Sequence, residues 1–466
     1  MLRTILTVSL LSTVMMAQPI DRTKPPETPA LPAFKLPPLH EFTLTNGLPV
    51  VLIEDTRLPM VTLRLAFQAG SKYDPAGHPG LSEAVSRLLT EGTASRPARE
   101  LAEEITGLGG AISASSNADH LMVAASGLSE NLDKLVELTA DIVRNANFPK
   151  DEVELYQQNR KQELQAQRAQ AAYLASEKFN EVVFGQHPYA RRSPTPESID
   201  ATSTETLAAF RDKHLMPNNA VLVLLGNLPP RAQVRKMLET RFGDWKKGTA
   251  PKLTASAPPK PKRSITVVNR PGSVQADIQM GRLGLTRTQD GYFPLVVGNT
   301  ILGGGASSRL FNDIREKRGF AYSVGSGHAA LAEAGVFRSV MQVRNEVVEP
   351  AIEAMTEHLA AMGKERVSAD ELSNVKNYLS GTFVMSLETQ AGMAGQVVST
   401  KALGLPNSYL ETYTTRIRAT EPDQIQAIAR QVMSPESISI VVVGDAKSIL
   451  PAVEKFGEVD VSEARD

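Results

Sequence analysis

Three polar side chains lie at helical spacing on one face of the segment 80–93. Glu83, Ser86 and Arg87 follow one another at positions i, i+3 and i+4, so a helix points all three the same way. The other face of that helix is an apolar stripe made of Leu81, Ala84, Val85, Leu88 and Leu89. Helices present pairs of metal ligands at this spacing, but these positions carry a carboxylate, a hydroxyl and a guanidinium.

The residue types in the chain limit which metal sites can form. There is no cysteine among the 466 residues, and the seven histidines are too far apart for any two to share a helical face. Thiolate zinc sites, iron–sulfur clusters and disulfides are therefore excluded. Arg87 keeps its positive charge in proteins, and the Ser86 hydroxyl is a weak base near neutral pH. We expect no metal at this helix and no cofactor in this chain.

The composition is that of an ordinary globular protein with more than one domain. Hydrophobic residues make up 42% and charged residues 22% of the chain, and the formal net charge is −1. This balance argues against nucleic acid or an anionic membrane as a partner. A chain of 466 residues is also longer than one hydrophobic core usually serves, so two or more domains are expected.

The N-terminus carries the features of an export signal. Residues 1–17 contain one arginine and then an apolar run that ends at the small residue Ala17. The run is shorter than the roughly 20 apolar residues of a membrane span, and no later segment provides one. A secretory signal peptide is predicted at 1–17, with a plain apolar tail as the alternative. A proline-rich linker follows at 18–39. We expect an exported, periplasmic protein, soluble after the signal peptide is removed.

From residue 40 onward the pattern of strands and helices predicts two domains of one kind. The predicted boundaries are an N-terminal domain at 40–245, a linker at 246–263, a C-terminal domain at 264–456 and a tail at 457–466. Runs of strands with separate helices indicate an α+β class, in which each domain is a largely antiparallel sheet with helices packed on one face. One long helix is predicted from about 151 to 178.

Two pairs of landmarks indicate that the second domain repeats the first. Gly226 and Gly444 end two buried strands, one in each half of the chain. Asp151 and Asp370 begin two helical segments, again one in each half. The separation along the chain is nearly the same for both pairs. Two independent landmarks at nearly one offset predict a duplicated domain.

Short motifs in both halves resemble one family of peptidases. The first half contains NGLPVVLIED, AGSKYD, GHPGLSEAV, EGT, LGGAISASSNADH, FPKDEVE and VVFGQHPY; the second contains NRPGSVQADIQMG, ILGGGASSRLFNDIREKRGFAYSV and VVVGD. In this order and spacing they resemble the pitrilysin/insulinase family of zinc peptidases, in the branch of short two-domain subunits typified by mitochondrial processing peptidase. The resemblance covers nearly the whole chain after residue 40.

Active members of that family carry the zinc signature H-x-x-E-H on this helix. By resemblance, Glu83 and Arg87 stand where the two histidine ligands would be, Ser86 where the general base would be, and Glu163 where the remaining ligand would be. No histidine lies between 79 and 119, so shifting the alignment does not restore the motif. The resemblance implies a subunit that is inactive on its own. Arg87 is expected either to pair with Glu163 or Glu83, or to remain a solvated surface charge.

A second pair of interest is Arg315 and Tyr322 in the segment REKRGFAY. A helix capped by Ser307 or Ser308 and ended by Gly319 places Arg315 in its last turns and Tyr322 on the next strand. From spacing alone, Arg315 is a cation favoured by the helix dipole and Tyr322 is an ordinary strand aromatic. The resemblance implies another role, in which the pair reaches the partner's zinc site and holds the substrate carbonyl and the developing oxyanion.

Gly303, Gly304 and Gly305 precede that segment. They lack the G-x-x-x-x-G-K-[ST] frame and a preceding buried strand, so a flexible turn is expected rather than a phosphate loop. In the zinc-less subunit of the processing peptidase a glycine-rich loop here helps to admit substrate, and the resemblance extends that role to these glycines. The segment LGGAISASSNADH resembles the edge strand on which the family's active half lays its substrate; packing alone is the other interpretation.

Two functions follow as expectations. The first is a zinc-less subunit of an exported heterodimeric metalloendopeptidase, which supplies Arg315, Tyr322 and chamber walls to a homologous zinc-binding partner that acts on extended peptides. The second is a non-proteolytic scaffold or assembly protein derived from the same family. A scaffold has no need of the arginine–tyrosine pair, so the pair favours the first.

Overall fold

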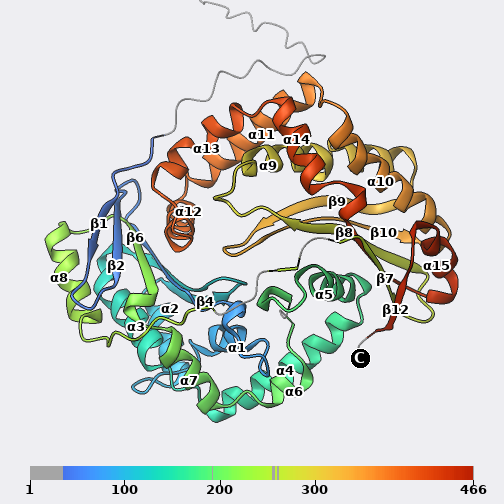
Figure 1. Cartoon of the computed structure of the whole chain (residues 1–466). Coiled ribbons are helices and arrows are strands. Elements are labelled where there is room, and N and C mark those ends of the chain that lie inside the picture. Colours follow the sequence, from blue (N-terminus) through green and yellow to red (C-terminus); the bar gives the residue numbers. More distant parts are fainter. Residues whose placement is uncertain (1–34, 191–192, 254–257, 260–261, 465–466) are drawn as a thin grey trace, which may run out of the picture. The chain divides into compact units, whose positions relative to one another are not determined.

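The computed structural model describes residues 35–190, 193–253, 258–259 and 262–464 (Figure 1). The predicted signal peptide at 1–17 lies outside the described residues, as does most of the proline-rich segment 18–39. The predicted linker at 246–263 is described in part. Within the described ranges, no helix combines the length and the apolar character needed to cross a membrane.

The first half is built on a six-stranded sheet with the order β1-β2-β6-β3-β5-β4. Its strands are β1 (His40–Thr43), β2 (Pro49–Glu54), β3 (Met60–Phe67), β4 (Ala111–Ser116), β5 (Leu121–Leu128) and β6 (Ala220–Gly226). A tight turn at Asn46 and Gly47 joins β1 to β2, and Gly47 adopts a φ of 86° that glycine tolerates without strain. β2 and β6 are parallel, and the other neighbours are antiparallel.

The second half is built on another six-stranded sheet, with the order β12-β7-β11-β8-β10-β9. Its strands are β7 (Ser264–Asn269), β8 (Gln275–Gly284), β9 (Ala321–Ala330), β10 (Gly335–Arg344), β11 (Ser439–Gly444) and β12 (Asp460–Glu463). From the second position onward this order repeats that of the first sheet, including the parallel pair β7 and β11. The outer strand differs, because β1 comes from the start of its half while β12 comes from the end of the chain. The predicted α+β class with two similar domains is confirmed.

The first half contains a series of helices in addition to its strands. They are α1 (Leu81–Leu88), α2 (Ala98–Gly107), α3 (Leu132–Asn145), α4 (Lys150–Arg168), α5 (Ala171–Phe184), α6 (Pro196–Asp200), α7 (Thr204–His214) and α8 (Arg231–Phe242). The amphipathic helices α1 and α3 bury their apolar faces in one core with the sheet, as the 3.6-residue period of those faces predicts.

The second half has its own series of helices. They are α9 (Tyr292–Gly303), a π-helical segment (Phe311–Lys317), α10 (Val348–Lys364), α11 (Ala369–Ser386), α12 (Gln390–Ala402), α13 (Ser408–Arg418), α14 (Pro422–Val432) and α15 (Ala446–Val453). The helix α9 packs on the edge strand β9, and α10 packs against α14.

The single long helix predicted at 151–178 is wrong, because the structure has two helices there. The helix α4 ends at Arg168, and Gln170 is extended, with φ −100° and ψ 120°, before α5 begins. Arg270 of the second half donates a hydrogen bond to the carbonyl of Ala169 at 2.7 Å. This carbonyl lies at the break, where a continuous helix would direct it to its own backbone.

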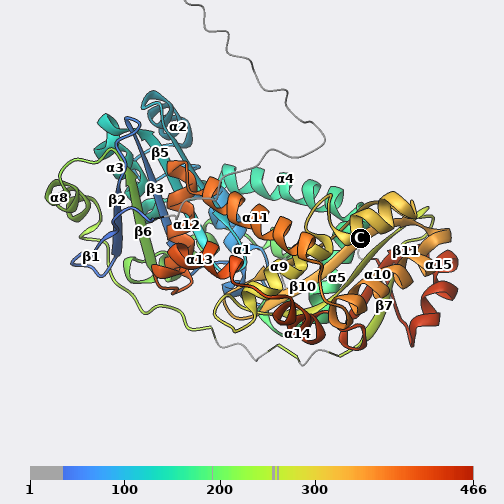
Figure 2. The same cartoon turned by 90° about the horizontal axis from the view of Figure 1, so that it is seen from above.

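The break lets each half give one helix to the other half's sheet. The helix α5 packs on β8 and β11 of the second sheet, and α12 packs on β3 and β6 of the first (Figures 1 and 2). A second arginine repeats the anchor of Arg270: Arg57 donates to the carbonyl of Glu388, at the corner between α11 and α12, at 3.0 Å. The two accepting carbonyls occupy equivalent positions in the duplicated domains. Ala169 and Glu388 are separated along the chain by the same number of residues as Asp151 and Asp370.

A cluster of charges, of which Lys72 and Asp119 are buried and Glu333 is exposed, joins the two halves near this exchange. Lys72 Nζ lies 3.1 Å from Asp119 Oδ1 and 3.1 Å from Glu333 Oε1. Tyr189 donates its hydroxyl proton to Asp119, and the backbone N–H of Ala332 donates to the same carboxylate at 3.0 Å. Residues of the first half thus hold the turn between β9 and β10 of the second. Lys72 and Asp119 are both buried, so each depends on the other for its charge.

Candidate functional site

The helix α1 carries the predicted polar row and is fixed at its start by the half-buried carboxylate of Asp74. It begins after Gly80, which adopts a φ of 90°. Asp74 accepts hydrogen bonds from the backbone N–H groups of Gly80 and Ser82, each at 2.8 Å. This carboxylate satisfies two of the donors that a helix start leaves free. Burial raises the pKa of Asp74 to about 7.

Glu83, Arg87 and Glu163 meet between α1 and α4, and Arg160 joins them. Arg87 Nη2 lies 2.9 Å from Glu83 Oε1, and Arg87 Nη1 lies 3.1 Å from Glu163 Oε1. Arg160 Nη2 lies 3.4 Å from Glu83 Oε2, and Arg160 Nη1 lies 3.5 Å from Glu163 Oε2. Each guanidinium therefore contacts both carboxylates. The four charges form a closed ring that ties α1 to α4.

The members of this ring differ in burial. The Arg160 side chain is 4% exposed, whereas those of Arg87 and Glu163 are 44% and 43% exposed. Burial disfavours the charge of Arg87, but its hydrogen bond to Glu163 and the charge of Glu83 outweigh that effect and raise its pKa. Arg160 was not among the residues predicted from the sequence. Its signal was present, since Arg160 precedes Glu163 by three residues and so lies on the same face of α4.

Ser86 takes no part in the ring of charges. It is buried, and its hydroxyl donates to the backbone carbonyl of Glu83 at 2.8 Å. A serine in a helix interior commonly forms such a local bond to the preceding turn. The Ser86 hydroxyl therefore forms its hydrogen bond within α1 rather than with the charged residues.

The residues at these positions do not fit a zinc ion. Zinc takes deprotonated cysteine, neutral histidine or carboxylate ligands, and Arg87 and Arg160 already neutralise both carboxylates. A divalent cation placed between Glu83 and Glu163 would face two fixed positive charges. Across the described ranges, no group of three or more His, Cys, Asp or Glu residues is placed to hold a metal ion.

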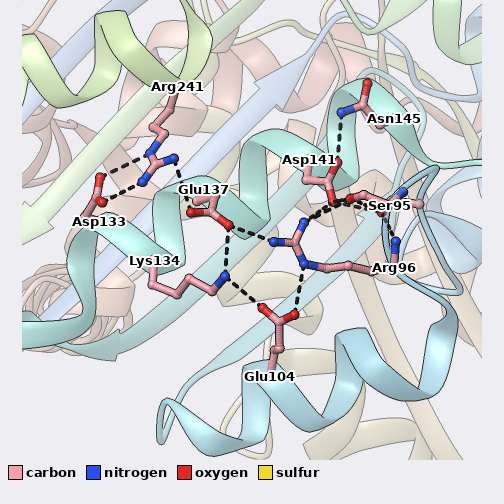
Figure 3. A network of polar contacts seen from close by, with 10 residues as sticks. Ser95, Arg96, Glu104, Asp133, Lys134, Glu137, Asp141, Asn145 and Arg241 are labelled. Atoms are coloured by element: carbon pink, nitrogen blue, oxygen red, sulfur yellow. Dashed lines mark hydrogen bonds and ion pairs between the residues drawn. The ribbon is translucent and has the colours of Figure 1, made fainter.

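A second network, shown in Figure 3, holds the loop that follows α1. Arg96 contacts three carboxylates: Glu104 of α2 at 3.0 Å, and Glu137 and Asp141 of α3 at 2.8 Å and 2.7 Å. Lys134 bridges Glu104 and Glu137 at 2.9 Å each. These contacts fasten the loop and α2 to α3, which fixes the C-terminal end of α1.

Arg315 and Tyr322 are in contact with each other in the structure. The guanidinium carbon of Arg315 lies 4.8 Å from the centre of the Tyr322 ring and 4.6 Å from that of Phe311. Such distances are those of cation–π contacts. Tyr322 lies on β9 and is 82% exposed. The pair is thus a guanidinium held between two aromatic rings, one of which reaches into solvent.

The segment that carries Arg315 is π-helical rather than α-helical. Ser308 accepts a hydrogen bond from the Phe311 N–H at 3.4 Å, so this serine acts near the start of the segment. Gly319 adopts a φ of 63° just after its end. Arg309 is bound to Glu371 of α11 through two hydrogen bonds of 2.7 Å and 2.9 Å. The segment is therefore tied to α11 shortly before Arg315.

The three glycines lie where α9 meets the turn that leads to this segment. Gly303 ends α9, and a Cβ on it would lie 2.3 Å from the backbone N of Ser326 on β9. Glycine is thus required for the close packing of α9 on β9. A Cβ on Gly304 would meet Thr300, whereas Gly305 has open space around it.

The segment LGGAISASSNADH provides β4, which lies at the edge of the first sheet. Alternate residues of β4 are exposed. The strand β9, which carries Tyr322, occupies the corresponding edge of the second sheet. Both edges keep backbone groups that a further strand can pair with.

Two family models match the chain one after the other. The model described as "Insulinase (Peptidase family M16)" matches residues 49–197, and the model described as "Peptidase M16 inactive domain" matches residues 202–379. The chain belongs to peptidase family M16, the pitrilysin/insulinase family. The two six-stranded sheets with their helices form two M16-like domains.

Curated relatives are similar to this chain along nearly their whole length. A protein of Streptomyces coelicolor named "uncharacterized zinc protease" is 25% identical over 418 residues, which cover 88% of this chain and 90% of that protein. A protein of Rickettsia felis with the same description is 27% identical over 411 residues, covering 86% of this chain and 96% of the relative.

Solved structures give the same result for the fold. The crystal structure of a peptidase M16 inactive domain from Pseudomonas fluorescens has a TM-score of 0.82 and 28% identity, and it covers 87% of this chain and 98% of that one. A protease from Helicobacter pylori has a TM-score of 0.81 at 20% identity, covering 88% of this chain and 100% of that chain, which supports the fold alone.

Proposed function

We propose that this M16 protein is a zinc-less subunit of an exported heterodimeric metallopeptidase and acts on the substrate through Arg315 and Tyr322. A homologous partner supplies the zinc ion and the general base. The observation that carries the proposal is the Arg315–Tyr322 contact of 4.8 Å, with a tyrosine ring that is 82% exposed.

The exposure of Tyr322 favours a role of the pair in binding a ligand over a role in packing the core. A strand aromatic that served the core would be covered, and Tyr322 is instead the most exposed of the large hydrophobic side chains in the described part of the chain. The one ion-pair contact of Arg315 among those residues is with its neighbour Glu316, at 3.4 Å. The guanidinium and the phenol can therefore donate to a carbonyl oxygen or an oxyanion.

The first half contributes structure to the proposed chamber. The ring formed by Glu83, Arg87, Arg160 and Glu163 joins α1 to α4, the two helices that a zinc ion would join in an active half. The exposed edge of β4 suits an extended peptide, which can add to such an edge by main-chain hydrogen bonds. Extended peptides are accordingly the proposed substrates.

Reconstitution with a partner tests the proposal. The candidate partner is an M16 protein with an intact H-x-x-E-H motif, encoded near this chain's gene. Each purified protein and their equimolar mixture are assayed with quenched fluorescent peptides. We expect cleavage by the mixture that exceeds the sum of the separate proteins at least tenfold, and co-elution of the two chains on size exclusion.

Additive activity without co-elution would contradict the subunit proposal. Co-elution without any gain in activity would instead support the scaffold function. Export rests on the predicted signal peptide alone, and fractionation of cells that produce the full chain tests it: the proposal expects the mature protein in the periplasmic fraction.

A further inference from the structure

A cavity of about 620 Å³ lies at the start of α9, on the second half of the chain. The loop before α9 and the helices α13 and α14 form its walls. The residues of its lining that matter here are Arg287, Asp290, Tyr292, Phe293, Tyr409 and Arg416. None of them belongs to the Arg315–Tyr322 pair or to the ring of charges on α1.

Two arginines of this cavity have no carboxylate partner. No ion pair involving Arg287 or Arg416 is found within the described ranges, and the Nε of Arg287 is buried without a hydrogen-bond partner. The guanidinium of Arg416 lies 4.7 Å from the centre of the Phe293 ring. The one acid of the lining is Asp290. The cavity thus has two fixed positive charges and one negative charge, a balance that suits a monoanion better than a phosphate dianion.

The phenol of Tyr409 adds a third hydrogen-bond donor. Tyr409 is 5% exposed, and its hydroxyl makes no hydrogen bond of good geometry with the described part of the chain. Burial raises the pKa of Tyr409, and the neighbouring Tyr292 adds to the effect. The hydroxyl therefore keeps its proton at neutral pH and can donate it. The contact with the Tyr292 side chain is too poorly aligned to satisfy this buried donor, so a ligand that accepts a hydrogen bond from Tyr409 would stabilise it.

The first half indicates what kind of group is missing. The helices α1 and α9 both begin after a glycine in the left-handed conformation, Gly80 with φ 90° and Gly291 with φ 87°. At α1 the carboxylate of Asp74 accepts from the N–H groups at the helix start. Among the described residues, no carboxylate does so at α9. The cavity with its two arginines lies at that place instead.

We propose that this cavity binds the carboxylate of a ligand that also carries an apolar group. The carboxylate takes the place at α9 that Asp74 occupies at α1, and it receives hydrogen bonds from Arg287 and Arg416 and from the Tyr409 hydroxyl. The apolar group packs on Phe293 and Leu405, both of which are buried at the cavity wall. A small aromatic acid and the C-terminal residue of a peptide share this chemistry.

Matched pairs of probes test the proposal by isothermal titration calorimetry on the full chain. The first pair is 3-phenylpropionate and its amide, and the second is N-acetyl-Ala-Phe with a free or an amidated C-terminus. A charge-assisted contact to an arginine predicts that the acids bind roughly 10-fold more tightly than the amides. Binding of the small acid shows that one carboxylate is sufficient, and binding of only the peptide acid identifies a peptide terminus.

Three variants and one control test whether the acid binds at this cavity. Arg287→Gln and Arg416→Gln should each weaken binding of the acid roughly 10-fold, while Arg418→Gln, an exposed residue outside the lining, should leave it unchanged. Asp290→Asn removes the opposing charge and should tighten binding, which a misfolded protein cannot do. Equal binding of acid and amide, no binding of either, or an unchanged affinity in Asp290→Asn would overturn the proposal.

Discussion

Arg87 and Arg160 contact the same two carboxylates through different oxygen atoms. Arg87 takes Oε1 of Glu83 and of Glu163, and Arg160 takes Oε2 of both. No oxygen is shared, so neither arginine competes with the other. Of the four ion pairs in the ring, two cross between the helices, Arg87–Glu163 and Arg160–Glu83. The positive charges stand where the resemblance would place a metal ion.

Removal of Arg160 should destabilise the protein more than removal of Arg87. Arg160→Met leaves two carboxylates short of a buried partner and is expected to lower the free energy of unfolding by about 1–3 kcal/mol, less than for a fully buried pair because both glutamates reach water. Arg87→Met removes a half-exposed charge and should cost below about 1 kcal/mol. Urea denaturation measures both. Arg99→Met, at a side chain that is 91% exposed, is the control. An equal loss for Arg87 and Arg160 would contradict the difference in burial.

Restoring the metal signature should create a zinc site. The triple variant Glu83→His, Ser86→Glu and Arg87→His writes H-x-x-E-H onto α1, and Glu163 of α4 is already placed as the third ligand. We expect one zinc ion per chain by metal analysis after dialysis, against none above background for the natural sequence. The further change Arg160→Gln should tighten binding, because it removes a positive charge beside the metal.

A fourth change serves as the control for that site. Glu163→Gln, added to the triple variant, should lower zinc affinity at least tenfold. Loss of a direct metal ligand lowers the affinity more than loss of a residue that only contacts a ligand. Stoichiometric zinc in the natural protein would mean that the ring of charges opens and that Glu83 and Glu163 can bind a metal beside the two arginines.

The features predicted well from the sequence are those that depend on the local hydrophobic period and on the repetition of motifs along the chain. The nearly equal spacing of two pairs of landmarks marked the duplication, and the apolar stripe of α1 placed Leu81 and Leu88 in the core, where both are buried. The contact between Glu83, Arg87 and Glu163 was one of two alternatives. Arg160 was missed because an arginine on a polar helix face is usually a solvated charge, and only the fold shows that α1 covers it.

The exchange of helices between the halves was not predictable from these patterns. The residues Leu174 and Phe179 give α5 an apolar face, but a hydrophobic period does not say which sheet will cover it. The break before α5 was missed for a related reason. No glycine or proline marks Ala169 and Gln170, and the contact that accompanies the break comes from Arg270, which lies far along the chain in the second half.

The stability of the protein should carry a pH dependence that comes from Asp74. Burial raises the pKa of this group to about 7 in the folded state, while an unfolded aspartate titrates near 4. Between about pH 4 and pH 7 the folded state binds more protons, so its contribution to the free energy of unfolding falls as the pH rises, by at most about 1.4 kcal/mol per pH unit. Asp74→Asn removes this titration.

Urea denaturation of both proteins at several pH values between 4.5 and 8 measures the effect. The difference between wild type and Asp74→Asn should change steadily up to about pH 7 and be flat above it. Parallel curves across that range would mean that Asp74 titrates normally. Glu371 provides a contrast, because its hydrogen bonds to Arg309 lower its pKa to about 2 and its contribution is lost only at more acidic pH.

Tyr322 and Arg315 should matter for turnover and hardly for stability. In the reconstituted complex, Arg315→Ala and Tyr322→Phe are expected to lower kcat tens- to thousands-fold, the range of a lost oxyanion donor. The Tyr322 side chain is 82% exposed, so its hydroxyl does not stabilise the fold. Tyr322→Phe should therefore shift the free energy of unfolding by less than about 0.5 kcal/mol. Tyr378→Phe, at another exposed tyrosine, is the matched control. A loss of partner binding at unchanged kcat would show that Arg315 and Tyr322 belong to the subunit interface. Unchanged turnover in both variants would show that the pair is only a cation–π contact without a catalytic role.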